Sequence, residues 1–338
     1  MKILLHSVFV LVLFSSFALA AGNSVEISDS SDMLEIREHI GNVRETITEV
    51  ELDALAGGTI MTQQGTTEYN QYLRFSNTVT GAETLSTSVV DFTVNDDPNS
   101  IVGDFLYTKE GTVVNESFFE YQQEYEDGLE SVVASTKLPD YLGVQLNIIG
   151  TPYVFVDTFI DTSTNKIAFT LLSNPYHLLM DENQTQQVVY NGNTYNIEVL
   201  VIQSTPTVTL RINGQMLTQL TEGQAVPLAD GTIVGILHII PNTLTGDLVE
   251  FYLATSSLKL TDNDYTDSET TSGVGANLGY TQGVEISGEP IEDAFVMVTG
   301  TEKTNTEFEV NSIKYRLVAD ALPGLRDVYA PSGHGVRE

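Results

Sequence analysis

The acidic run that begins at Asp262 has the residue types of a calcium-binding loop. Asp262-Asn263-Asp264 is followed by Asp267 and Glu269, so several side-chain oxygens lie close together in the sequence. Calcium in proteins is held by carboxylate, amide and carbonyl oxygens. The run lacks the glycine and the final glutamate that an EF-hand loop has at fixed positions. A solvated acidic linker is therefore the simpler interpretation, and calcium binding is the alternative.

Two tripeptides match the acceptor pattern for N-linked glycosylation. They are Asn115-Glu116-Ser117 and Asn183-Gln184-Thr185. Such tripeptides also arise by chance in a chain rich in Asn and Thr, and they carry meaning only in an exported protein. If the chain is exported, Asn115 and Asn183 are its candidate glycan sites.

The motifs of common enzyme classes are missing from the sequence. It has no cysteine, no H-E-x-x-H zinc motif, no G-x-S-x-G serine motif and no phosphate-binding loop. His39, His177, His238 and His334 lie in separate segments, and none has a partner four residues away. We therefore expect no enzyme. A glycoside hydrolase needs only two suitably spaced carboxylates, so that class stays open, although the absence of tryptophan disfavours sugar stacking.

The N-terminus has the parts of a secretory signal peptide. Lys2 gives a positive start, residues 3–17 are mostly apolar, and Ala18-Leu19-Ala20 forms a small-residue cleavage site. The apolar run is too short to cross a bilayer comfortably. We expect residues 1–20 to be removed and the mature chain to be extracellular, without a membrane span.

The composition of the chain is strongly acidic and lacks covalent cross-links. It has 46 acidic residues against 14 lysines and arginines, with a formal net charge of −32 at pH 7. This charge disfavours nucleic acid and anionic lipid as partners and favours divalent cations or a saline habitat. Because there is no cysteine, the fold must rely on packed cores, bound ions or neighbouring subunits.

Tight-turn pairs lie between strand-like runs in the middle of the chain. Asn191-Gly192, Asn213-Gly214 and Asp230-Gly231 tolerate the positive φ angles that short hairpins need. Their flanks are rich in β-branched and aromatic residues with partial alternation. The sequence predicts an all-β fold of tandem antiparallel, immunoglobulin-like sandwiches with few short helices; one of these helices is expected around residues 33–40.

Composition shifts suggest the domain boundaries. We expect a signal peptide at 1–20, an N-terminal β domain at 21–180 and a hairpin-rich β domain at 181–260. A linker rich in Asp, Gly, Ser and Thr would follow at 261–279, and a third β domain at 280–338.

Short β-type motifs recur in a defined order along the chain. They are Tyr72-Leu73-Arg74-Phe75, Gly103-Asp104-Phe105-Leu106-Tyr107, Gly150-Thr151-Pro152-Tyr153-Val154, Tyr190-Asn191-Gly192-Asn193-Thr194-Tyr195, Arg211-Ile212-Asn213-Gly214-Gln215, Leu228-Ala229-Asp230-Gly231-Thr232 and Lys314-Tyr315-Arg316-Leu317. In their order and spacing they resemble the surface-layer (S-layer) proteins of small-genome archaea. Family members look longer, so the resemblance implies that the third domain is incomplete and that an anchoring region is missing or supplied elsewhere.

Three functions follow from these observations. The resemblance implies a self-assembling subunit of a cell-envelope lattice at the cell surface, a homo-oligomer whose acidic faces are bridged by divalent cations such as calcium. The first alternative is a secreted or surface adhesin that holds a partner or a glycan. The second is a secreted glycoside hydrolase that uses a carboxylate pair. We rank them in this order.

Overall fold

The computed structural model describes residues 46–74, 90–94, 104–108, 117–241, 246–266, 281–291, 294–318 and 328–331. The expected signal peptide, the expected helix near residues 33–40 and most of the expected linker lie outside these ranges. Within them the fold is all-β, and its helices are two short 3-10 turns, η2 (Asp53–Leu55) and η3 (Pro139–Tyr141). The all-β prediction is confirmed, while the immunoglobulin-like topology stays a prediction.

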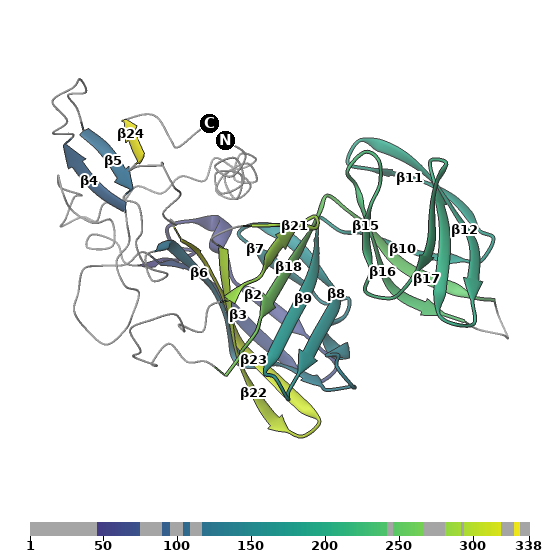
Figure 1. Cartoon of the computed structure of the whole chain (residues 1–338), viewed down its shortest axis with the longest axis horizontal. Helices are drawn as coiled ribbons and strands as arrows, with labels where there is room; N and C mark the ends of the chain where they lie inside the picture. The colour runs from purple at the N-terminus through teal and green to yellow at the C-terminus, as the bar shows by residue number, and fades with distance from the viewer. Residues whose placement is uncertain are drawn as a thin grey trace.

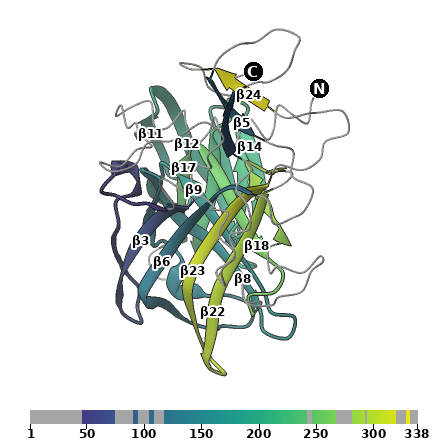
Figure 2. The same cartoon turned by 90° about the vertical axis from the view of Figure 1, so that its left-hand side faces the viewer.

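The first sandwich packs a seven-stranded sheet against a six-stranded sheet. The seven-stranded sheet contains, in spatial order, β1 (Thr46–Ile47), β3 (Thr66–Arg74), β6 (Ser117–Val132), β23 (Glu307–Val318), β22 (Ala294–Thr304) and β19 (Thr281–Gln282), with β2 (Gly58–Met61) paired to β3. The six-stranded sheet contains β21 (Glu289–Pro290), β20 (Val284–Ile286), β18 (Ser256–Asp262), β9 (Lys166–Ser173), β8 (Thr151–Asp161) and β7 (Gln145–Ile148). In Figure 2, β3, β6, β23 and β22 run side by side in this order.

Aromatic residues dominate the core between these two sheets. Tyr141, Phe155 and Phe169 are almost fully buried, and their ring centroids lie 5.6–6.1 Å apart in tilted or edge-on arrangements. Offset and edge-to-face geometries of this kind are the favoured arrangements of aromatic rings. The first sandwich therefore has a core large enough to replace the disulfides that the chain lacks.

The second sandwich is built from residues 176–254 alone. One four-stranded sheet contains β10 (Tyr176–Asp181), β17 (Leu248–Ala254), β16 (Ile233–Ile240) and β15 (Ala225–Pro227). The other contains β11 (Thr185–Tyr190), β12 (Asn193–Gln203), β13 (Thr207–Ile212) and β14 (Gln215–Leu220). Its separate core includes Tyr195, Val199, Leu210 and Phe251, none of them exposed to solvent. A further small sheet pairs β24 (Val328–Pro331), β5 (Asp104–Thr108) and β4 (Val90–Val94).

The second sandwich is an insertion within the first. It leaves the first sandwich after β9 and returns into β18, and these two strands are direct antiparallel neighbours, with Ser173 opposite Ser256. Figure 1 shows β10–β17 as a lobe beside the body that contains β8 and β9. A small apolar cluster, in which Val154, Val156 and Leu172 meet Leu237 and Tyr252, fills the junction. The sheets are therefore stacked in four layers, with apolar contacts between each layer and the next.

The domain boundaries expected from composition differ from the observed strand pairing. The expected N-terminal domain (21–180) contains β6, and the expected third domain (280–338) contains β22 and β23, yet β23 pairs with β6 along most of its length. Phe119 and Leu317 are cross-strand partners. Local composition carries no signal of pairing between residues so far apart in sequence. The hairpin-rich unit, expected at 181–260, is observed as the sandwich of residues 176–254.

Two of the expected tight turns are confirmed in the geometry of the backbone. Asn191 (φ 46°) and Gly192 (φ 77°) join β11 to β12, and Asn213 (φ 47°) and Gly214 (φ 84°) join β13 to β14. In the third pair only Gly231 takes a positive φ, of 90°, within the longer connection between β15 and β16. Positive φ at both residues is the requirement of the two-residue hairpin turn.

Candidate functional site

Asp262, the first candidate calcium ligand, is a buried residue of β18. Its side chain has 0% relative exposure, and one carboxylate oxygen accepts a hydrogen bond of 2.7 Å from the backbone N–H of Val298. The other oxygen accepts a bond of 2.8 Å from the backbone N–H of Asp264. A buried carboxylate is stable when backbone donors satisfy it. Asp262 therefore joins β18 to β22 across the first sandwich.

The remaining candidate ligands are not gathered around Asp262 in the described part of the chain. The Asp264 carboxylate accepts hydrogen bonds from the backbone and hydroxyl of Thr266, which closes a local turn. Asp267 and Glu269 lie outside the described residues. Among the residues that the structure describes, no group of three or more histidine or acidic side chains is arranged to hold a metal ion. Calcium binding stays a prediction.

Asn183 occupies an exposed turn immediately before β11. Its φ is 63°, and its backbone N–H donates a 2.8 Å bond to the carbonyl of Val199. The side-chain amide is thus carried on a fixed backbone at the surface. Asn115 lies outside the described residues, so glycosylation of both asparagines stays a prediction.

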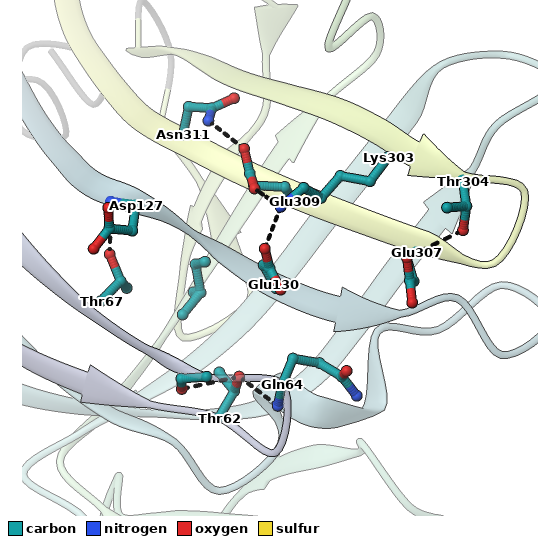
Figure 3. A network of polar contacts seen from close by, with 12 residues as sticks. Thr62, Gln64, Thr67, Asp127, Glu130, Lys303, Thr304, Glu307, Glu309 and Asn311 are labelled. Carbon is teal, nitrogen blue, oxygen red and sulfur yellow. Dashed lines mark hydrogen bonds and ion pairs between the residues drawn. The ribbon is translucent and has the colours of Figure 1, made fainter.

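A network of opposite charges crosses three strands of the seven-stranded sheet (Figure 3). Lys303 of β22 forms ion pairs with Glu130 of β6 and, at 2.7 Å, with Glu309 of β23. The side chain of Asn311 donates a further 2.9 Å bond to Glu309. Gly128 leaves room for this carboxylate, because a Cβ at that position would lie 2.3 Å from Cγ of Glu309.

The charge of Lys303 sets the protonation of the network. Partial burial alone would raise the pKa of Glu309, but the hydrogen bonds from Lys303 and Asn311 and the lysine charge lower it below its ordinary value. Hydrogen bonds to Glu130 and Glu309 raise the pKa of Lys303. The network therefore stays ionised near neutral pH. We interpret it as a strap between strands, because its charges are already paired with each other.

A cleft of about 530 Å³ lies at the junction of the two sandwiches. One wall comes from residues 59–63 and 139–145 of the first sandwich, and the other from Leu237, His238, Glu250 and Tyr252 of the second. Ligand sites are frequent at domain junctions, where two surfaces supply polar groups to one space. This cleft is the strongest candidate for small-molecule binding in the described residues.

Two histidines that lie far apart in the sequence share a sheet at this cleft. His177 Nε2 lies 2.7 Å from Glu250 Oε1, and His238 is the cross-strand partner of the same Glu250. The His177 ring also packs 5.1 Å, between centroids, from the ring of Tyr252. The sequence gave no indication of this group, because each member comes from a different strand and only the antiparallel register brings them together.

The cleft is equipped to donate hydrogen bonds at neutral pH. Burial, with a smaller contribution from the charge of Glu250, raises the pKa of Tyr252 to about 12, so its hydroxyl stays protonated. Glu250 is held by His177 rather than left free as a general base. These groups could orient a polar ligand, and they form neither a nucleophile–base pair nor a pair of free carboxylates.

Comparisons with known proteins supply no further identification. No model of a known protein family matches the chain, and no curated protein matches it. In the described ranges, no helix combines the length and apolar character that a bilayer crossing requires. The functional argument therefore rests on the geometry of the chain and on its resemblance to S-layer proteins.

Proposed function

We propose that the chain is a structural subunit of a surface-layer lattice. The observation that carries this proposal is the four-layer stack, in which the inserted sandwich is held to its host by two chain crossings and an apolar junction. A subunit that repeats in two dimensions must present its contact surfaces at a constant angle, and a domain tied at two points can do so. The order of short β motifs along the chain supports the same proposal.

The junction between the sandwiches has little freedom to act as a hinge. Ser173 is fully buried, and its hydroxyl lies 2.7 Å from the hydroxyls of both Thr255 and Ser256 at the crossing. Tyr190 of the inserted sandwich donates a 2.8 Å bond to the carbonyl of Asn174. Flexible hinges usually lack such a set of buried contacts.

The distribution of charge also suits a subunit that meets copies of itself. Most described cations are paired within the chain, as in Lys137–Asp157, Arg211–Glu198 and Lys259–Glu285. The unpaired surface charge is therefore mainly negative, so that copies repel until cations screen or bridge them.

Assembly of the purified mature protein tests the proposal. With millimolar calcium we expect extended sheets visible by negative-stain electron microscopy, and a chelator should disperse them. A magnesium-only sample and a high-salt sample separate specific bridging from screening of charge. A protein that stays monomeric at high concentration in all of these conditions would count against a lattice subunit.

The junction cleft favours the adhesin or binding module as the second candidate. Its polar groups come from both sandwiches, which is the arrangement expected of a ligand site. Saturable binding of a glycan or peptide, lost in a Tyr252→Phe variant and without self-association of the protein, would favour this function over the lattice.

A further inference from the structure

The inserted sandwich has one sheet edge without the features that usually discourage strand pairing. Edge strands carry free backbone donors and acceptors, and natural proteins protect them with charges, prolines, bulges or short length. Among the described residues, β11 pairs only with β12, and its six residues include no charge and no proline. The surrounding segment, residues 183–197, is also free of charged residues in a chain whose net charge is −32.

The other edges of the inserted sandwich are protected. β10 carries Asp181, and β15 is three residues long and contains Pro227. β14 is irregular, because its register with β13 shifts and Gln219 takes a φ of 56°. The Gln215 side chain also accepts a 2.8 Å bond from the backbone of Ala229, which ties the start of β14 to the following loop. The contrast singles out β11.

The register of the sheet shows which backbone groups of β11 are free. The backbone N–H of Asn196 in β12 accepts its partner on the β13 side, since it donates to Asn213 Oδ1, and the Asn196 carbonyl accepts from Asn213 N–H. Alternate residues of a strand direct their backbone groups to opposite sides. Tyr195 and Ile197 therefore face β11 and meet Val188 and Gln186. It follows that Thr185, Gln187 and Val189 direct their N–H and C=O groups away from the sheet.

The side chains along this edge are compatible with a close approach. Thr185, Gln187 and Val189 are exposed, with Val189 at 65% relative exposure. The Gln187 side chain donates a 2.9 Å bond to Asn196 on its own sheet, which leaves the space beyond the edge open. β-branched residues and amides pair well across strands, and no like charges would meet.

We propose that β11 is a self-association edge, where it pairs antiparallel with β11 of a second copy of this chain about a two-fold axis. Gln187 would lie opposite Gln187 of the partner subunit, and Thr185 opposite the partner's Val189. In this register each free N–H finds a free C=O, and the exposed faces of the two sheets stay on the same side. The pairing joins two four-stranded sheets into one continuous sheet across the dimer.

This inference deepens the proposed function, on which it rests for its biological meaning, by naming one contact of the array. A two-fold contact alone closes on itself and gives a dimer. A lattice would add other contacts to this dimer as its building unit. The chemistry of the edge also explains how acidic copies could approach, because the contact surface itself is uncharged.

A single introduced cysteine tests the pairing, because the chain contains no other thiol. In an antiparallel hydrogen-bonded pair the Cα atoms are about 5.5 Å apart, and disulfides accept Cα separations up to about 6.8 Å. We expect Gln187→Cys to form a disulfide dimer at least tenfold faster than Thr218→Cys, an exposed position on β14 of the same sheet. The protein should come from a host that does not glycosylate Asn183, since a glycan there would obstruct the contact.

A proline variant provides the second measurement. Gln187→Pro removes an N–H that points away from β12, so the sandwich should fold while the dimer is lost in sedimentation velocity. Gln187→Ala keeps the N–H and should keep the dimer. Circular dichroism checks that both variants retain the β fold.

Two results would overturn the inference. One is a rate of disulfide formation for Gln187→Cys no higher than for Thr218→Cys; the other is a Gln187→Pro variant that associates like the parent chain. Preferential mixed disulfides between the two cysteine variants would replace the two-fold contact with a head-to-tail one. Sheets that form without any Gln187 contact would sink this inference and leave the lattice standing, whereas discrete dimers that never form sheets would do the reverse.

Discussion

A buried ion pair joins the two longest strands of the seven-stranded sheet. Arg316 of β23 and Glu120 of β6 are cross-strand partners 2.7 Å apart, and their side chains are 3% and 1% exposed. Charges removed from water depend on each other, because loss of one leaves the other without compensation. The pair therefore ties residues on opposite sides of the insertion to one another.

Substitution of Arg316 by methionine should destabilise the protein strongly. We expect Arg316→Met to lower the free energy of unfolding by about 3–5 kcal/mol, since Glu120 would remain buried and charged. The double variant Glu120→Gln with Arg316→Met should recover part of this loss in urea denaturation. A loss for the single variant within the range of exposed pairs, about 1 kcal/mol or less, would show that water reaches Glu120.

Tyr195 and Asp230 provide a pH-dependent contribution in the inserted sandwich. The buried Tyr195 hydroxyl donates a 2.7 Å bond to Asp230. Burial alone would raise the pKa of Asp230, but this bond and those from Thr232 lower it below its ordinary value. A lowered pKa means that the stabilisation is present above the unfolded pKa of about 3.9 and is lost as the pH falls through the folded pKa.

The variant Tyr195→Phe should therefore lose about 1 kcal/mol at pH 7, and less as the pH falls below about 4. Tyr190→Phe is the matched control, because its hydroxyl donates to the carbonyl of Asn174, which does not titrate. Thermal unfolding of both variants at several pH values provides the measurement. A Tyr195→Phe deficit that stays constant down to pH 2 would contradict the assignment.

At this scale the sequence indicated residue types better than residue roles. Asp262 was a reasonable candidate for a metal ligand, but its main partner is a backbone N–H of Val298, on a strand that the sequence could not place beside it. The group of His177, His238 and Glu250 was missed for the same reason. Side-chain roles that depend on long-range register have no local signature.

The contact between the sandwiches depends on a missing side chain at Gly235. A Cβ at this position would lie 2.3 Å from Cδ1 of Leu172, so strand β16 can approach β9 only because Gly235 has none. Its φ is not in the left-handed region, so the requirement is for space. The glycine therefore fixes how closely the two middle layers pack.

Gly235→Ala should cost about 1–3 kcal/mol through overpacking at the junction. Leu172→Ala alone should also destabilise, by about 2–5 kcal/mol, because it leaves a cavity. In the double variant the new methyl group enters the space that Leu172 vacated, so the combined loss should be smaller than the sum. Additive losses in a double-mutant cycle would show that the two residues do not meet.

Local elements were largely readable from the sequence, whereas their pairing was not. Asn191-Gly192 and Asn213-Gly214 identified two hairpins because turn chemistry is local. The insertion escaped notice because β9 and β18 become neighbours only after the intervening sandwich has folded on its own core. Boundaries in a discontinuous domain cannot be inferred from composition.

At the scale of the whole molecule, stability comes from stacked cores and association is controlled by charge. Three apolar layers hold the four sheets together without a disulfide. The net charge of −32 opposes contact between copies, and the uncharged edge of β11 is where that opposition is weakest. A lattice subunit needs both properties: a rigid body and a small number of permitted contacts.

Electron cryotomography of the native cell envelope, with this chain labelled, tests the central claim most directly. The account predicts a periodic array on the outer surface whose repeating density contains the label and accommodates the four-layer stack. A label found inside the cell, or scattered on the surface without any periodic order, would contradict it.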